Sequence, residues 1–184
     1  RDTRISSDML ESALIAGICD MGGDVKPVGT IPTPAVAYLA RRERADAGIV
    51  ISASHNPYEH NGIKVFSGQG YKLSDEVEAR IEERILSGEP MKHRTRGEIG
   101  LRHHGMRQLK REYIDFVAST VETDLAGLKI LVDCANGAAS ATAARLFDRF
   151  PDLHTDVIHA DPDGVNINHG CGSTHLDSLR AMVK

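Results

Sequence analysis

The stretch Gly48-Ile-Val-Ile-Ser-Ala-Ser-His-Asn-Pro57 decides the fold, together with Asn61-Gly-Ile-Lys64 a few residues downstream. Its three consecutive β-branched residues are typical of a strand that is buried on both faces. The proline prevents that strand from continuing, and Asn-Gly is a strong turn signal. Because the connection is too short for a crossover helix, residues 63–67 are expected to return as an antiparallel strand.

Polar side chains gather where this predicted strand ends, namely Ser52, Ser54, His55 and Asn56. In open α/β sheets, ligands bind at the carboxyl ends of strands, so a hydroxyl, an imidazole and an amide on this loop indicate a candidate site. The alternative is a polar loop held only by local serine and asparagine turns, which is the commoner use of these residue types. Whether this loop is a ligand site or only a polar turn has to be judged from the rest of the sequence.

The remaining chain alternates predicted helices and strands, which indicates βαβ units and a mixed, mostly parallel sheet. An apolar stripe and a capping box formed by Asp8 and Glu11 predict a helix over residues 8–21. Further helices are expected from a cap at Thr33 to about residue 44, from a cap at Ser74 to about residue 87 with Val77, Ile81 and Ile85 on the inner face, over residues 107–121 and 140–150, and after a cap at Thr174. Further strands are expected at residues 24–28, 128–132 and 156–160.

These elements divide into two α/β units, residues 1–122 and 123–184, with a boundary near residues 122–127. The second unit has too few elements for a complete core, and the first begins without a methionine. We therefore expect the chain to be the amino-terminal part of a longer protein, with its first strand or strands missing.

The composition excludes several classes of function. A formal net charge of −4 gives no basic signature for nucleic-acid binding. No run of about 18 apolar residues is present, so no membrane span is expected. Cys19, Cys134 and Cys171 are odd in number and lack Cys-x-x-Cys spacing, which favours the cytoplasm and argues against a zinc knuckle or a disulfide framework. His103-His104 lies in a predicted loop and is interpreted as solvated surface.

A serine hydroxyl needs an adjacent base or cation before it can act as a nucleophile. The sequence lacks both the Gly-x-Ser-x-Gly elbow of the α/β-hydrolases and the Walker phosphate loop. Next to Ser54 stand His55 and, on the returning strand, Lys64. Such groups around a serine without a hydrolase elbow favour a phosphate carried on that serine. The alternative for Lys64 is an edge-strand lysine that prevents aggregation.

Several segments resemble one known family. Ser52-Ala-Ser-His-Asn-Pro57 with Asn61-Gly-Ile-Lys64 resembles the phosphoserine signature of the α-D-phosphohexomutases. Arg1-Asp-Thr-Arg4, Pro32-Thr-Pro34 and Val132-Asp-Cys-Ala-Asn-Gly-Ala138 resemble the same family in order and spacing. Pro162-Asp-Gly-Val-Asn-Ile-Asn168, followed by Cys171-Gly-Ser-Thr-His175, is more similar to the phosphoglucosamine mutase branch than to the phosphomannomutase and phosphoglucomutase branch.

The resemblance implies three-layer α/β/α domains, with domain I at residues 1–122 and part of domain II at residues 123–184 of a four-domain protein. It implies that Ser54 carries a phosphoryl group and exchanges it with a sugar phosphate, interconverting glucosamine 6-phosphate and glucosamine 1-phosphate through a 1,6-bisphosphate. The phosphate on Ser54 would be one ligand of a Mg²⁺ ion. Phosphoryl transfer depends on positioning and charge neutralisation, which suits a rigid loop with cations around it.

The resemblance also implies roles for single residues. Lys64 is expected to contact the transferring phosphate and to assist proton transfer, and His55 is a second candidate for that proton. Arg4 is a candidate phosphate contact, or else a cap for the neighbouring strand end. Ser52 and Asn56 are expected to support the loop, and Asn166, Asn168, Ser173 and Thr174 are interpreted as a polar turn and a helix cap, structural or at a domain interface.

The sequence departs from the family in one respect that limits its function. The family's later Asp-Gly-Asp-Gly-Asp-Arg loop, which supplies the other magnesium ligands, does not occur in this sequence, nor do its later sugar- and phosphate-recognition loops. This chain alone is therefore expected not to turn over substrate. A sugar phosphate is the expected partner, nucleic acid and membranes are not, and a homodimer is left open. Two alternatives remain: a phosphomannomutase or phosphoglucomutase with the same Ser54 chemistry, and a non-catalytic phosphate-binding module.

Overall fold

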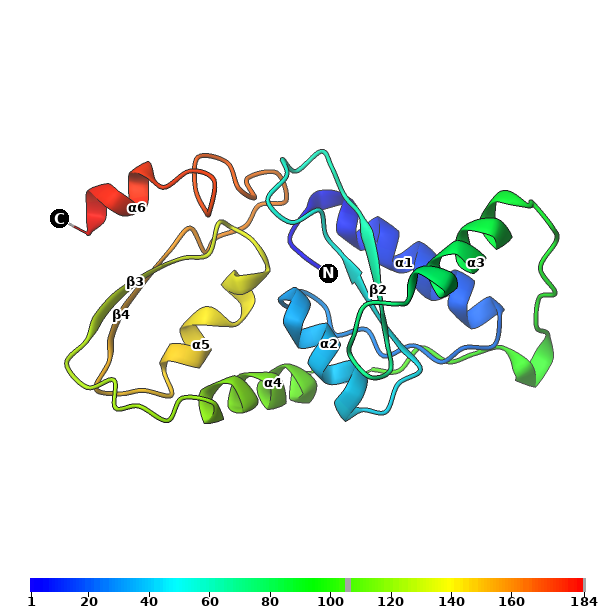
Figure 1. Ribbon diagram of the computed structural model, residues 1–184, viewed down its shortest axis with the longest axis horizontal. Coiled ribbons are helices and arrows are strands. Elements are labelled where there is room, and N and C mark those ends of the chain that lie inside the picture. The colour runs from blue at the N-terminus through cyan, green and yellow to red at the C-terminus, as the bar shows by residue number, and fades with distance from the viewer. Residues whose placement is uncertain (105–106, 184) are drawn as a thin grey trace.

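The computed structural model describes residues 1–104 and 107–183 and has an α/β fold (Figure 1). Helices α1 and α2 pack against strand β1, while α4 packs against both α2 and α5 and so links the two parts of the chain. The elements in chain order are α1 (Ile5–Asp20), α2 (Thr33–Arg42), β1 (Ala47–Ile51), β2 (Ile63–Ser67), α3 (Asp75–Leu86), η1 (Arg96–Glu98), α4 (Arg107–Ser119), β3 (Lys129–Asp133), η2 (Ala138–Ala141), α5 (Ala143–Phe147), β4 (His154–Ile158) and α6 (Asp177–Met182).

Strands β1 and β2 form the antiparallel pair that the Asn-Gly turn predicted, with Ile51 opposite Ile63 at the end where the loop leaves the sheet. Val50 and Ile51 are 1% and 4% exposed. Because neighbouring residues of a strand point to opposite faces, β1 is covered on both sides. The prediction of a doubly buried strand is confirmed, and the strand places its carboxyl end, and the loop that follows, on a rigid base.

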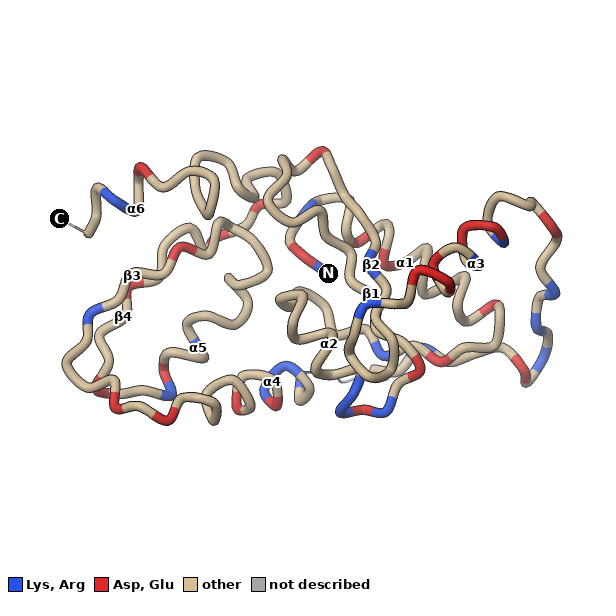
Figure 2. Tube along the Cα trace, viewed as in Figure 1, with Lys and Arg blue, Asp and Glu red and all other residues tan. Residues whose placement is uncertain are grey.

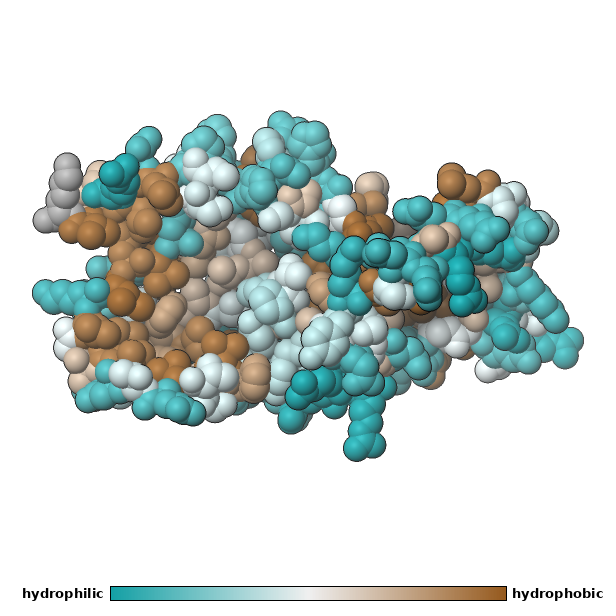
Figure 3. Space-filling model, viewed as in Figure 1, coloured by the Kyte–Doolittle hydropathy of each residue, from teal (hydrophilic) through white to brown (hydrophobic). Residues whose placement is uncertain are grey.

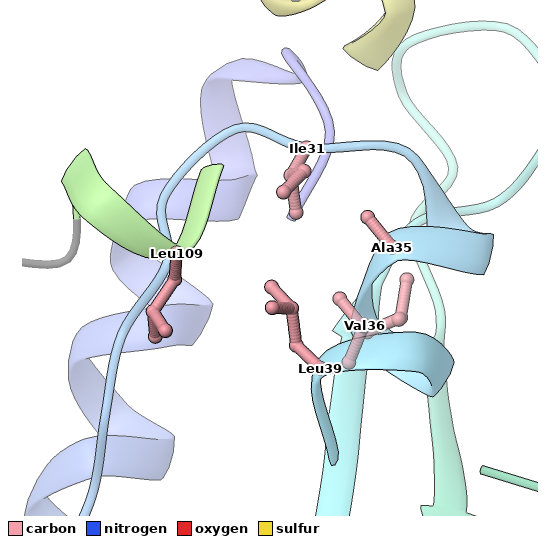
Figure 4. Close-up of a cluster of buried hydrophobic side chains, with 6 residues drawn as sticks. Ile31, Ala35, Val36, Leu39 and Leu109 are labelled. Carbon is pink, nitrogen blue, oxygen red and sulfur yellow. The ribbon is translucent and has the colours of Figure 1, made fainter. Parts of the chain in front are cut away.

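One apolar cluster supports this strand. Val50 packs with buried side chains from α2, from the segment before it and from α4. In Figure 4 these side chains converge on a common centre, with Leu109 of α4 closing the side opposite α2. The buried members are Ile31, Ala35, Val36, Leu39, Val50 and Leu109.

Strands β3 and β4 form a second, parallel pair. In the described residues the two strand pairs stay separate, one antiparallel and one parallel, so the strands of the expected α/β fold are of both kinds. The strand expected at residues 24–28 is reduced to a single bridge between Val25 and Arg102. Around β3, β4 and α5 the surface is apolar (Figure 3), and a hollow of about 220 Å³ lies between α4 and α5.

Several helix boundaries differ from those expected. Helix α1 begins at Ile5, and no side-chain hydrogen bond caps it, so the Asp8–Glu11 capping box is wrong. Pro32, not Thr33, is the residue before α2, and α6 begins after Leu176 rather than after Thr174. The expected helix over residues 140–150 is split into η2 and α5. Among the described residues, no helix has the length and apolar character needed to cross a membrane.

Helix α3 corrects a prediction about burial. It begins after Ser74, as expected, but the side chains assigned to its inner face are exposed, with Ile81 at 42% and Ile85 at 72%. Acidic residues are concentrated along this helix (Figure 2). An apolar spacing of three to four residues shows that a helix has an apolar side, but it does not show that another element covers that side.

We predict that Leu39→Ala lowers the free energy of unfolding by about 2–5 kcal/mol, because it opens a cavity in the cluster under β1. Ile81→Ala, on the exposed side of α3, should change it by less than about 1 kcal/mol. Urea unfolding of both variants, followed by circular dichroism, measures the difference. Equal losses would mean that α3 is packed as tightly as α2.

Candidate functional site

The loop between β1 and β2 presents Ser54 to solvent. Ser54 has a φ of 57°, a left-handed conformation that residues other than glycine seldom adopt. Its backbone N–H donates to the Ser52 hydroxyl at 3.1 Å, and the Ser52 N–H donates to the Gly62 carbonyl at 2.8 Å. The conformation of Ser54 is therefore supported from within the loop, and Ser52 lies where a supporting residue was expected.

Arg4 lies behind this loop, with a side chain that is 0% exposed. Its Nε donates to the His60 carbonyl at 2.7 Å, and its Nη2 donates to the carbonyls of Ser54 and Asn56 at 3.2 and 2.7 Å. The guanidinium thus binds three backbone oxygens of the loop from the buried side. Arg4 was a candidate phosphate contact, but its geometry is that of a loop support on the side away from solvent.

Asp2 balances the charge of Arg4. Its Oδ2 accepts from Arg4 Nη1 at 3.1 Å, and its Oδ1 accepts from the Arg4 N–H and from the Ser7 hydroxyl. The Ser7 hydroxyl in turn accepts from Asn61 Nδ2 at 3.2 Å. One buried network therefore joins the amino-terminal tetrapeptide, α1 and the Asn61-Gly62 turn, and both ends of the loop are held by it.

The other predicted catalytic residues are exposed. Lys64 is an exposed residue of β2, opposite Val50, and no hydrogen bond or ion pair joins it to Ser54. His55 is exposed next to Ser54. Asn56 contributes to the support of the loop through its backbone carbonyl, which accepts two hydrogen bonds. Roles in catalysis for Lys64 and His55 stay predictions.

A segment far along the chain also reaches the Ser54 loop. The side-chain Nδ2 of Asn168 donates to the carbonyls of Ser54 and Asn56, each at 3.1 Å. The segment between β4 and α6 lies beside the loop in Figure 1, and the two border a hollow of about 360 Å³. Asn168 was interpreted only as part of a polar turn or interface. The residues that line this hollow include His55, Tyr58, Glu59, Asn168, His169 and His175.

Asp133, at the end of β3, organises the second segment. Its Oδ1 accepts from the Ala135 N–H at 2.8 Å and lies 3.0 Å from His159 Nδ1, while its Oδ2 accepts from the Gly172 N–H at 2.8 Å. Burial favours the neutral acid, but these three hydrogen bonds outweigh it, so the pKa of the Asp133 carboxyl is lowered. Asp133 had been interpreted as a turn residue, and its sequence neighbourhood gives no sign of the bond to Gly172.

Asp133, His159 and Cys171 have ligand atoms within 4.8 Å of one another, so their spacing could hold a metal ion. Their chemistry does not suit the expected magnesium, which prefers oxygen ligands. Burial and the charge of Asp133 raise the pKa of the Cys171 thiol, which disfavours the thiolate that binds metals. The hydrogen bonds of Asp133 explain this cluster as a structural centre under the segment of residues 165–172.

Comparison with known proteins identifies the family. The sequence profile for phosphoglucomutase/phosphomannomutase, alpha/beta/alpha domain I, matches residues 1–92. The chain belongs to this family. The matched residues contain β1, the Ser54 loop, β2 and the Asp2–Arg4 pair.

Individual phosphohexomutases agree with this result. A phosphoglucosamine mutase from Ruminiclostridium cellulolyticum is 52% identical and is matched over 100% of this chain and 40% of its own length. A solved phosphoglucomutase/phosphomannomutase family protein from Burkholderia thailandensis is 26% identical with a TM-score of 0.79, covering 100% of this chain and 40% of that one. Aspergillus fumigatus N-acetylphosphoglucosamine mutase, solved with GlcNAc-6P and magnesium, shares the fold at 19% identity and a TM-score of 0.51, over 80% of this chain and 41% of that one.

This phosphohexomutase chain spans about 40% of the length of the curated relatives that it matches.

We predict that Asp2→Ala lowers the free energy of unfolding by about 3–5 kcal/mol, because it leaves the Arg4 guanidinium buried without a counter-charge. The matched control is Glu43→Ala, which removes the more exposed pair with Lys26 and should cost less than about 1 kcal/mol. Urea unfolding at pH 7 compares the two. Similar losses would contradict the central position of the Asp2–Arg4 pair.

The lowered pKa of Asp133 gives a pH-dependent prediction. A carboxyl with a lowered folded-state pKa stabilises the fold above its unfolded pKa of about 3.9, and this contribution is lost as the pH falls through the folded value. The stability advantage of the parent chain over Asp133→Asn should be constant above about pH 5 and should shrink below about pH 4. Asp156→Asn, at an exposed carboxyl on β4, is the control and should show little difference at any pH. An advantage that grows in acid would contradict this assignment.

Proposed function

We propose that the complete protein containing this chain is a phosphoglucosamine mutase, which interconverts glucosamine 6-phosphate and glucosamine 1-phosphate. The observation that carries the proposal is the Ser54 hydroxyl, exposed at a left-handed residue on a loop that a buried arginine holds from behind. Support comes also from the name of a relative that is 52% identical over this chain. The domain limits of 1–122 and 123–184 and a cytoplasmic location, which suits three free cysteines, belong to the same proposal.

The reaction consists of two phosphoryl transfers. In the first, the P–O bond to Ser54 Oγ breaks and a P–O bond to O1 of glucosamine 6-phosphate forms; the O1 proton passes to a base and Ser54 Oγ becomes protonated. In the second, the P–O bond to O6 of the reoriented 1,6-bisphosphate breaks and a P–O bond to Ser54 Oγ forms; Ser54 Oγ gives its proton to a base, O6 becomes protonated, and glucosamine 1-phosphate is left. Such transfers are accelerated by positioning and by charge neutralisation.

Lys64 is proposed as the cation that contacts the transferring phosphate and assists proton transfer, and His55 as a second group for that proton. Lys64 is exposed on β2, near the end of the hairpin where the Ser54 loop leaves the sheet. Its ammonium therefore remains available to an anion on the exposed side of the loop. Arg4 cannot take this role, because its side chain is 0% exposed behind the loop.

Magnesium is the proposed cofactor, and the residues of this chain fit only part of its site. A phosphate on Ser54 would supply one oxygen ligand, while the group of three acidic, histidine or cysteine side chains that is close enough to hold an ion in residues 1–104 and 107–183 lies at Asp133, His159 and Cys171, not at Ser54. The magnesium in the Aspergillus fumigatus enzyme supports the choice of cation. When bound, Mg²⁺ would neutralise charge on the phosphate.

A second candidate function is that of a phosphomannomutase or phosphoglucomutase with the same Ser54 chemistry. The name of the Burkholderia thailandensis relative favours it, at 26% identity. Assays of the complete protein on glucosamine, mannose and glucose phosphates separate the two. Preference for mannose or glucose phosphate would replace the first candidate by the second.

We predict that intact-mass measurement of the complete protein shows one phosphoryl group and that peptide mapping places it on Ser54. Ser54→Ala should lose that group and the mutase activity, because it removes the hydroxyl that is proposed to carry the phosphoryl group. Ser52→Ala is the matched control: it removes a hydroxyl that accepts a hydrogen bond but leaves the phosphoryl carrier. Absence of the phosphoryl group, together with full activity of Ser54→Ala, would refute the proposal and leave a non-catalytic phosphate-binding module.

The same assay tests Lys64. Lys64→Met should keep the fold and lower kcat by about 100-fold or more, the usual size of a contribution from acid–base catalysis. Unchanged kcat would assign Lys64 to protection of the sheet edge instead.

A further inference from the structure

The two donors that hold the Ser54 loop come from opposite parts of the chain. Asn168 Nδ2 donates to the carbonyl oxygens of Ser54 and Asn56, each at 3.1 Å. Arg4 Nη2 donates to the same two oxygens at 3.2 and 2.7 Å. A carbonyl oxygen has two lone pairs, so each oxygen is saturated by one donor from each side. This arrangement is called the Ser54 clamp below.

The position of Asn168 is itself fixed by the second α/β unit. Its backbone N–H donates to the Ala135 carbonyl at 2.9 Å, and its φ of 59° is left-handed, a conformation that asparagine tolerates better than most residues. The segment that follows is tied to β3 by the bond from the Gly172 N–H to Asp133. A Cβ at Gly172 would lie 2.6 Å from the Cβ of Ala135, so only glycine allows this close approach. The amide of Asn168 is therefore aimed at the loop by a rigid neighbourhood.

We propose that Asn168 is a positioning residue for phosphoryl transfer. It acts through the carbonyls of Ser54 and Asn56, holds the backbone of Ser54 in its left-handed conformation, and so directs the Oγ that carries the phosphoryl group. The orientation of that oxygen then depends on the second α/β unit as well as the first. This inference rests on the proposed function, since it assigns a role within the same reaction.

Asn168 matters for the reaction because the rate of phosphoryl transfer depends strongly on the positions of the reacting atoms. A left-handed serine is strained, so it relaxes toward a common backbone conformation when its neighbours are released. Arg4 holds the carbonyls of Ser54 and Asn56 from the buried side. The second donor, Asn168, limits how far these carbonyls can rotate around their bonds with Arg4. Displacement of a reacting atom by about 1 Å can cost about 100-fold in rate. The amide of Asn168 has therefore a measurable effect on kcat without touching the substrate.

Two substitutions separate the amide donor from the backbone at this position. Asn168→Gly keeps a residue that adopts φ of 59° readily and removes the donor. Asn168→Asp keeps the size of the side chain and places an anion against two carbonyl oxygens. The matched control is Asn166→Ala, which removes a neighbouring amide that donates to the Asp161 carbonyl and makes no bond with the Ser54 loop.

The complete protein, with Ser54 phosphorylated, is the material for the test. Asn168→Gly should lower kcat by about 10- to 100-fold with KM for the sugar phosphate changed by less than about threefold, because only the orientation of the transferring group is affected. Asn168→Asp should lose more, and Asn166→Ala should stay within about threefold of the parent. The ³¹P resonance of the phosphoserine should shift in Asn168→Gly and stay unchanged in the control. A general structural defect would instead reduce the amount of folded enzyme and leave kcat per active site unchanged.

Hydrogen exchange distinguishes failure of this inference from failure of the proposed function. The backbone amides of residues 52–60 should exchange faster in Asn168→Gly than in the parent or in Asn166→Ala. Parental kcat in Asn168→Gly, with an active parent enzyme, overturns the inference and leaves the phosphoserine mechanism intact. If the parent protein has neither phosphoserine nor mutase activity, the proposed function fails. In that case, unchanged hydrogen exchange of residues 52–60 in Asn168→Gly overturns the Ser54 clamp as well, and faster exchange of these residues supports the clamp.

Discussion

The buried ion pair between Asp2 and Arg4 is the interaction on which the rest of the site depends. A guanidinium with a side chain 0% exposed is tolerated only when a counter-charge and acceptors surround it, and Asp2 supplies the charge while loop carbonyls supply the remaining acceptors. The planar fork of arginine can reach several oxygens at once, which the single ammonium of lysine cannot do. The Asp2 N–H also donates to the Ile51 carbonyl at 3.0 Å, so the pair is fixed to the end of β1. The conformation of the Ser54 loop thus depends on the hydrogen bonds that the buried Arg4 guanidinium makes with the loop carbonyls and with Asp2.

The same pair determines which groups remain for the chemistry. Asp2 and Arg4 together carry no net charge, and both lie behind the loop, so they shape the site without providing a free cation to its exposed side. A phosphate on Ser54 would therefore need its counter-charge from the exposed side, where Lys64 and a metal ion are the proposed sources. This division separates the residues that fix the loop from those that meet the substrate. It also explains why the arginine of the family motif is better understood as part of the scaffold.

Local patterns in the sequence predicted the hairpin and the loop well, and tertiary hydrogen bonds escaped prediction. The three β-branched residues and the Asn-Gly turn are sufficient for a buried strand and its antiparallel return, because both signals act between near neighbours. The bonds from Arg4 and Asn168 to the loop span about 50 and about 110 residues and leave no periodic signal. Arg4 was therefore expected at a phosphate, and Asn168 was expected only in a turn or an interface. The prediction that one side of α3 is buried was wrong for a related reason, since apolar spacing does not reveal whether another element covers that side.

The two halves of the Ser54 clamp differ in what can disturb them. The Arg4 contacts join the amino-terminal segment to the loop between β1 and β2. The Asn168 contacts join the loop to the segment after β4. The bond from the Thr3 hydroxyl to the Asn136 carbonyl and that from the Ile5 N–H to the Gly164 carbonyl also join the amino-terminal part of the chain to segments after β3 and β4. Hydrogen bonds at 3.1 Å lie close to the upper limit of good geometry, so a relative displacement of about 1 Å is enough to break those of Asn168. The loop therefore has one support from the amino-terminal segment and one from the segment after β4, so the orientation of Ser54 depends on the placement of both.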